Sequence, residues 1–127
     1  MTVAQKVQAV LIADSGVTAL VDAARIKLPG DWQQLPRPYI VHFPVAGTGI
    51  QTYSEGLANL KRWSYQVTCV GNTYSSAEAV AIAVRNILGD YRVGGIQSFW
   101  SGNGPALYDA DLKVHEISID FEIHDAL

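Results

Sequence analysis

The stretch Trp63-Ser-Tyr-Gln-Val-Thr-Cys-Val-Gly-Asn-Thr-Tyr-Ser-Ser-Ala-Glu-Ala-Val-Ala-Ile-Ala-Val-Arg-Asn-Ile-Leu-Gly89 changes its hydrophobic period halfway along. From 63 to 69, aromatic and aliphatic residues alternate with polar ones, which is typical of a strand with one buried face. From 77 to 88, apolar residues recur every three or four positions, which predicts an amphipathic helix. Ser75 followed by Glu78 fits a capping box, and Gly89 can end the helix in the left-handed conformation. The stretch therefore predicts a strand covered by the helix that follows it.

The residues before this stretch predict two more helices. Apolar positions from 3 to 11 follow the helical period and indicate a first amphipathic helix of about three turns. An Asp-Ser-Gly break follows, in which Asp14 or Ser15 can cap a shorter helix. This second helix is expected from about Val17 to Ala24, with Leu20 and Val21 directed inward.

A proline-bearing linker and a strand connect these helices to the central stretch. Three prolines between 25 and 38 exclude a continuous helix, and apolar residues should hold the linker against the domain: Ile26, Trp32 and Leu35. The strand begins at Tyr39, with Tyr39, Val41, Phe43 and Val45 on one parity. Pro44 cannot donate a ladder hydrogen bond, so this strand should lie at an edge or bulge there. Residues 47–59 are expected to form a long loop or a hairpin excursion, and long connections are more often functional than short ones.

Two strands are predicted after the central helix. The first runs from Ile96 to Trp100, and a turn is expected at 102–106 because the sequence there is Gly-Asn-Gly-Pro-Ala. The last strand runs from about Leu112 to His124 and separates an aliphatic face from a polar one. The aliphatic face holds Ile117, Ile119, Phe121 and Ile123, and the polar face holds Glu116, Ser118, Asp120 and Glu122. Val114 is out of phase with Ile117, which indicates a bulge near His115 and Glu116.

The predicted order of elements is α-α-β-β-α-β-β over one domain, residues 1–127. This order favours a two-layer α+β fold in which helices back one side of a mostly antiparallel sheet of about four strands. The length of 127 residues is enough for one core without disulfides, and the single cysteine cannot form one within the chain. Cys69 has the apolar parity of its strand and is expected to be buried.

The bulk composition bounds the class of protein. Apolar residues make up 49% and charged residues 17%, which is an ordinary globular balance. A formal net charge of −3 argues against a protein whose main task is gripping nucleic-acid phosphates. No window resembles a signal peptide or approaches the ~20 apolar residues of a membrane span. We therefore expect a soluble protein made in the cytoplasm, with no membrane partner.

No motif in the chain calls for catalysis, a cofactor or a metal ion. His42, His115 and His124 are expected on solvent-side or edge positions of strands, without metal-ligand spacing. The pair Asp109 and Asp111 is best read as turn chemistry. Glycine pairs at 47–49 and 102–104 lack the third glycine and the strand–helix context of phosphate loops, and are read as hairpin glycines. The expected burial of Cys69 argues against a reactive thiolate.

Two features of the sequence favour protein contacts. Several aromatic residues lie on predicted loops and edges, where exposed rings tend to dominate interfaces: Trp32, Tyr53, Phe99, Trp100 and Tyr108. Phe99 and Trp100 have opposite parity, so one of the two should be exposed. The acidic residues Glu116, Asp120 and Glu122 share a strand face, which is either solvated or, repeated around a ring, the lining of a channel that repels DNA phosphates.

The arrangement resembles the tail-completion proteins of long-tailed bacteriophages and prophages, also called tail terminators or head-to-tail joining proteins. The resemblance rests on four groups of residues: Arg25-Ile26 before Pro29, Leu35-Pro36 and Pro38-Tyr39-Ile40-Val41, Tyr65-Gln-Val-Thr-Cys-Val-Gly-Asn-Thr-Tyr74, and Ala77, Ala81 and Leu88 in the helix. It covers most of the chain, except 47–60 and 94–111.

The resemblance implies a structural protein of the virion and no enzymatic activity. It implies a ring, typically of six copies, on the head-proximal end of the tail tube, which stops polymerisation and offers a docking surface to the head connector while DNA passes through the lumen without specific binding. The candidate contact segments are 47–59, with Tyr53, and 99–108, with Phe99, Trp100 and Tyr108. Glu116, Asp120 and Glu122 are candidates for the lumen face. The alternatives are a head-side neck or connector protein, and a small-ligand-binding α+β domain of bacterial metabolism.

Overall fold

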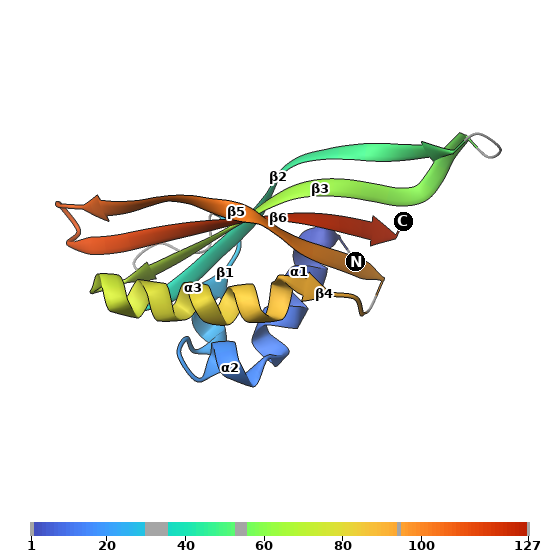
Figure 1. The fold of residues 1–127 in the computed structure, drawn as a ribbon. Helices are drawn as coiled ribbons and strands as arrows, with labels where there is room; N and C mark the ends of the chain where they lie inside the picture. Colours follow the sequence, from blue (N-terminus) through green and yellow to red (C-terminus); the bar gives the residue numbers. More distant parts are fainter. Residues whose placement is uncertain (1, 30–35, 53–55, 94, 127) are drawn as a thin grey trace.

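A computed structural model describes residues 2–29, 36–52, 56–93 and 95–126. The helices are α1 (Val3–Ala13), α2 (Ser15–Thr18), the 3₁₀ turn η1 (Ala23–Arg25) and α3 (Tyr74–Leu88). The strands are β1 (Ile26–Lys27), β2 (Tyr39–Thr52), β3 (Gly56–Gly71), β4 (Asp90–Tyr91), β5 (Ile96–Asp109) and β6 (Val114–Ala126). Figure 1 shows all helices on one side of the sheet, so the predicted α+β class is confirmed.

The strands form one six-stranded sheet in the order β1-β2-β3-β6-β5-β4. The four predicted strands are β2, β3, β5 and β6, and their pairings are antiparallel. The expected count of about four was too low because β1 and β4 have only two residues each, too few to show a hydrophobic period. The sheet is mixed, since β1 runs parallel to β2 while β4 runs antiparallel to β5.

The hydrophobic core lies between the sheet and the helices. Alternate residues of β3 and β6 point into it, as their period predicts, and α1 and α3 contribute one stripe each. The largest fully buried side chains in this layer include Tyr65, Phe121, Leu11, Leu88, Ile119 and Ile123. Cys69 is buried as expected, and burial raises the pKa of its thiol to about 12.

The opposite face of the sheet, called the outer face here, carries a small apolar cluster at one end. It consists of Tyr39, Val41, Val70 and Val114, with Phe43 packed against it. The pairing of β6 with β3 is unbroken through His115 and Glu116, so the predicted bulge there is wrong. Val114 is out of phase with Ile117 because it packs in this outer cluster, on the other side of the sheet.

Two helix boundaries differ from the prediction. Thr73, two residues before Ser75, caps α3 by accepting a hydrogen bond from the Ser76 amide at 3.1 Å. Gly89 ends α3 with φ −65° and ψ −26°, so it does not adopt the left-handed conformation. A side chain is nevertheless excluded there, since a Cβ would lie 2.5 Å from the Arg85 carbonyl oxygen.

The second helix is shorter than the sequence predicts. Asp14 caps α2 through the Val17 amide at 3.0 Å, but the helix ends at Thr18. Val21 is buried, as predicted. Leu20 is 43% exposed, so the prediction that it points inward is wrong.

The segment 47–59 continues the sheet as a hairpin, which was one of the two expected alternatives. β2 and β3 stay paired as far as Thr52 and Gly56, with register shifts between Pro44 and Ala46 and between Gly49 and Gln51. The first shift confirms the bulge expected at Pro44. Figure 1 shows this hairpin, called the arm here (residues 44–52 and 56–64), extending past the helices.

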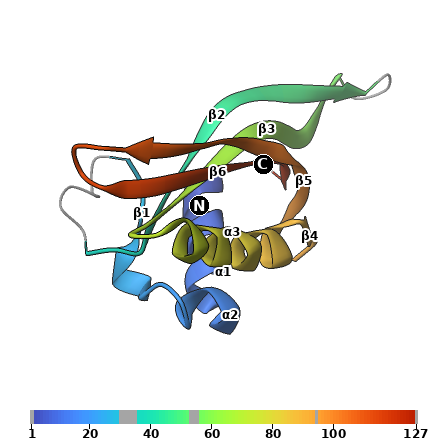
Figure 2. The ribbon, with the colours of Figure 1, turned by 60° about the vertical axis from the view of Figure 1, so that its left-hand side comes forward.

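The second hairpin is longer than expected and its turn lies elsewhere. β5 continues through 102–106 to Asp109, so the turn predicted there is wrong. Two register shifts, between Trp100 and Gly102 and between Asn103 and Ala106, absorb the glycines and Pro105 without ending the strand. The chain turns instead at 110–113, where Lys113 has a φ of 55°. Figure 2 shows the β5–β6 hairpin leaving the helical layer at the end opposite the arm.

Candidate interaction surfaces

Trp100 is exposed and held in place by two neighbours. It lies on the helix side of β5 and is 47% exposed. The guanidinium of Arg85, from α3, lies 5.3 Å from the Trp100 ring centroid. The indole Nε1 donates a hydrogen bond to Asn103 Oδ1 at 3.0 Å. A large ring that is fixed before any partner arrives loses little side-chain entropy on binding, which suits an interface.

Tyr108 belongs to an aromatic group at the start of α3. Its ring centroid lies 4.7 Å from that of His115, and the Tyr74 ring meets the same imidazole edge-on at 6.3 Å. Tyr74 and Tyr108 are 49% and 56% exposed. The Tyr74 hydroxyl donates to the Glu78 carboxylate, and this hydrogen bond raises the pKa of Tyr74. The group therefore combines exposed ring faces with a carboxylate.

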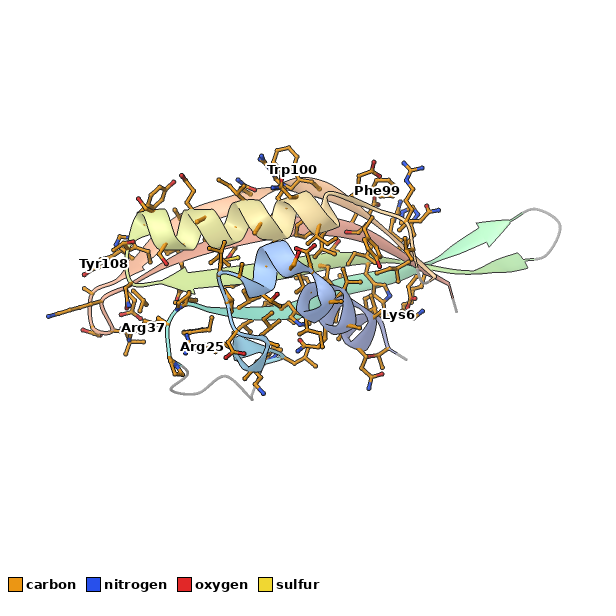
Figure 3. All side chains as sticks on the ribbon, turned by 90° about the horizontal axis from the view of Figure 1, so that it is seen from below. Lys6, Arg25, Arg37, Phe99, Trp100 and Tyr108 are labelled. Carbon is orange, nitrogen blue, oxygen red and sulfur yellow. The ribbon has the colours of Figure 1, made fainter. Side chains whose placement is uncertain are left out.

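A groove of about 250 Å³ runs between α3 and β5 and joins these two groups. We call it the α3–β5 groove. Tyr74, Glu78, Ile82, Arg85 and Asn103 form its walls, and Ile117 and Ile119 form its floor. Figure 3 shows Trp100 above α3 and Tyr108 at the end of the molecule where α3 begins.

Phe99 lies on the other side of the sheet from Trp100, so the predicted opposite parity is confirmed and Trp100 is the exposed ring. Phe99 packs edge-on against His124, with ring centroids 5.7 Å apart, and the Arg92 guanidinium lies 5.5 Å from its centroid. Tyr53 lies outside the described residues. The three described contact residues, Phe99, Trp100 and Tyr108, therefore do not form one patch.

The acidic residues of β6 share the outer face, as their alternation predicts. Asp120 is exposed, and Glu116 and Glu122 are half-buried. Arg62 approaches Glu122 with its Nε 3.4 Å from Oε1, which offsets part of the negative charge. Between Glu116 and Asp120 the face is polar and uncharged, because Gln66 donates to Ser118 Oγ at 3.1 Å and Thr68 lies 3.3 Å from the same hydroxyl.

The base of the arm is closely packed. A Cβ on Gly47 would lie 2.6 Å from Cε3 of Trp63, so the ring lies directly over the glycine. Lys61 Nζ lies 4.3 Å from the centroid of the same ring. Trp63 is partly buried against the core, and these contacts fix the direction in which the arm leaves the sheet.

The prediction for His42 is wrong, because this side chain is in the core. His42 is fully buried, with Nδ1 2.5 Å from the Tyr65 hydroxyl and Nε2 2.6 Å from Gln8 Oε1. Burial lowers the pKa of the imidazole to about 4, so it is neutral at physiological pH. The sequence misleads here because the other parity of β2 is the more apolar one.

The described part of the chain holds no cluster of metal-binding side chains. Among those residues, no three His, Cys, Asp or Glu side chains lie together so as to hold a metal ion. None of the described helices has the length and apolarity needed to cross a membrane. The Asp109 carboxylate accepts from the amides of Asp111 at 3.0 Å and Leu112 at 3.2 Å, which is the turn role expected of this pair.

The chain is thus a small α+β domain with a projecting arm, the α3–β5 groove and a polar sheet face. The chain belongs to the family described as tail completion protein gp17, which matches residues 5–124. Membership gives it a structural role in a phage tail and a place in the virion.

A solved structure agrees with this fold. A chain from the structure titled "Virion of native gene transfer agent (GTA) particle" superposes with a TM-score of 0.70 at 16% identity, covering 94% of this chain and 90% of that one. At this level of identity the likeness concerns the fold alone. No curated protein matches the sequence.

Proposed function

We propose that the chain caps the head-proximal end of a phage tail tube as a hexameric ring, ends tube polymerisation and joins the tail to the head connector. Its partners are further copies of itself, the tube protein and the connector proteins. This proposal goes beyond family membership, which supplies only the tail role.

The arm is the observation that carries the proposal. A capping protein must grip the end of one assembly and present a different surface to the next. The arm and the β5–β6 hairpin leave the helical layer at opposite ends (Figures 1 and 2), so one subunit has two separate extensions. Contacts between different patches of identical subunits are heterologous and close into rings when the rotation allows it.

The test is polymerisation of purified tube protein with and without this chain. We expect tubes of limited length with a ring on one end when the chain is present, and long uncapped tubes without it, as counted by electron microscopy. Binding along the sides of the tubes, or no effect on their length, would contradict the capping role. Binding to the connector alone would favour a head-side neck protein.

Replacing Gly47 with valine should weaken capping. The new side chain would collide with the Trp63 ring, which is 2.6 Å from the position of a Cβ. Overpacking of this kind costs about 1–3 kcal/mol and would redirect the arm. The matched control is Ala46→Val on the exposed neighbouring position. A lowered melting temperature of Gly47→Val would show that the new side chain disturbs the base of the arm. If that variant still caps tubes as well as the control does, the arm does not grip the tube.

Reversing the acidic outer face should slow DNA passage. We assign Glu116, Asp120 and Glu122 to the lumen side, where fixed negative charge keeps DNA phosphates from adhering. The variant Asp120→Lys with Glu122→Lys is expected to slow DNA ejection, measured as dye-labelled DNA released per particle. The control, Asp22→Lys with Asp111→Lys, makes the same charge change at exposed sites outside the strands of this face. If particles with either variant release DNA at the same rate, the acidic residues do not line the lumen.

A further inference from the structure

The α3–β5 groove has the chemistry of a site for a cationic side chain. Its apolar floor can cover the methylene stem of an arginine or lysine, while Glu78 on its wall can accept the charged head. Tyr74, Tyr108 and Trp100 place exposed ring faces beside it, and ring faces attract guanidinium and ammonium groups. Arg85 lies two helical turns from Glu78 and is directed at Trp100, so it leaves the Glu78 end open.

The opposite edge of the sheet carries cations. Arg25 ends η1, Lys27 ends β1 and Arg37 precedes β2; we call these three residues the basic edge. Within the described ranges, the side chains of Arg25 and Lys27 have no hydrogen-bond or ion-pair partner, and Arg37 Nη1 makes one hydrogen bond, to Asn72 Oδ1 at 3.3 Å. Six of the chain's nine basic residues are Lys6, Lys61, Arg62, Arg85, Arg92 and Arg37, and each of these has a partner within the chain.

These two surfaces cannot meet within one molecule. Figure 3 shows Arg25 on the β1 side of the sheet and Trp100 on the β5 side. In the sheet order β1 and β5 are separated by β2, β3 and β6. Complementary surfaces on opposite edges of one subunit can be satisfied only by another copy or by a different partner.

We propose that the α3–β5 groove of one copy receives the basic edge of the next. The inference rests on the proposed ring and specifies which surfaces form it. Arg25 or Lys27 enters beside Glu78, with its stem against Ile82, and the rings of Tyr74 and Tyr108 flank the charge. The contact is heterologous, so each copy uses its groove on one side and its basic edge on the other, which is the arrangement that propagates around a ring.

Charge reversal with mixing tests the contact. Arg25→Glu with Lys27→Glu gives an edge variant, and Glu78→Arg gives a groove variant. Each alone would face like charge, and we expect subunit association to weaken about 100-fold, measured by native mass spectrometry over a range of concentrations. Mixed in equal amounts, they should regain wild-type association, because each reversed surface then meets a reversed partner.

The mixed rings carry a further signature. Edge and groove variants must alternate, so the restored rings should contain equal numbers of each, which isotope labelling of one variant reveals by mass. The control, Arg62→Glu with Arg92→Glu, makes the same charge change outside both surfaces and should associate like wild type. Circular dichroism confirms that each variant is folded.

The outcomes separate this inference from the proposed function. The groove contact is overturned if the edge variant or the groove variant alone forms as many rings as wild type, or if mixing the two restores no rings. Neither result bears on tube capping, which the tube-length assay tests separately. A wild-type chain that caps tubes without associating with itself also overturns it. Rings that obey the charge rules but leave tube length unchanged support the contact and contradict the capping role.

Discussion

Lowering the pH from neutral to about 4 is expected to remove about 3 kcal/mol of folding free energy through His42 alone. The imidazole is fully buried between β2, β3 and α1, and burial lowers its pKa from 6.5 to about 4. No carboxylate contributes to this shift, so desolvation of the charged form is the physical cause.

The sign follows from proton counting. Between pH 6.5 and about 4 the unfolded chain binds a proton at His42 that the folded chain does not bind. Stability from this group is therefore complete above 6.5 and falls as the pH approaches 4. Urea unfolding at several pH values measures how the free energy of unfolding changes with pH.

The hydrogen bonds of His42 fit the neutral form of the imidazole. Gln8 Nε2 donates to the Ile26 carbonyl at 2.7 Å, so its Oε1 accepts from His42 Nε2–H. Nδ1 then accepts from the Tyr65 hydroxyl. A second proton on the ring would turn Nδ1 into a donor, and the Tyr65 hydroxyl would have to reorient to accept from it. This network connects α1 to three strands, β1, β2 and β3.

The variant His42→Gln supplies the comparison. Glutamine can hydrogen-bond to both neighbours but has no group that titrates in this range. Its stability at neutral pH should be lower than that of wild type, and its loss between pH 6.5 and 4 should be smaller by about 3 kcal/mol. If the free energy of unfolding falls with pH equally in the two proteins, His42 is solvated in the folded state.

The sequence was sufficient for the parts of the fold that have a clear period. The alternation in β3 and β6 and the helical stripe of α3 led to the correct buried residues, because half-buried elements must repeat with their own geometry. The proline bulge in β2 was likewise predictable from a missing donor.

Features that depend on distant contacts were not predictable. His42 lies on the less apolar parity of β2, and only its hydrogen bonds with Gln8 and Tyr65 make its burial favourable. Glycines and a proline at 102–106 indicate a turn locally, yet β6 pairs with this segment across two register shifts. Pairing over a whole hairpin outweighs local turn preference.

The candidate surfaces were visible only in part. Trp100 and Tyr108 were identified by residue type, but Glu78 was predicted only as part of a capping box and Arg85 was not singled out. Their connection to the rings depends on how α3 crosses β5, which no local pattern encodes. The basic edge was missed because Arg25, Lys27 and Arg37 are split between two elements and a linker.

Breaking the ion pair between Lys6 and Asp125 is expected to cost about 3 kcal/mol of folding free energy. Lys6 lies in the first turns of α1, and Asp125 lies near the end of β6, with side chains only 18% and 8% exposed. Asp125→Ala leaves the Lys6 ammonium without this counter-charge in a mostly buried position. Urea unfolding measures the loss.

The pair also holds together the part of the sheet from which the arm leaves, since Asp125 is opposite Lys61 of β3. The double variant Lys6→Met with Asp125→Leu replaces both charges by apolar groups and should be more stable than Asp125→Ala, because no charge is then left buried. If the two single losses simply add in a double alanine variant, the charges do not stabilise each other. A double-variant loss that differs from the sum of the two single losses would show that the two charges stabilise each other and so hold α1 to the base of the arm. A force applied to the arm by a bound partner would then reach the helical layer through this contact.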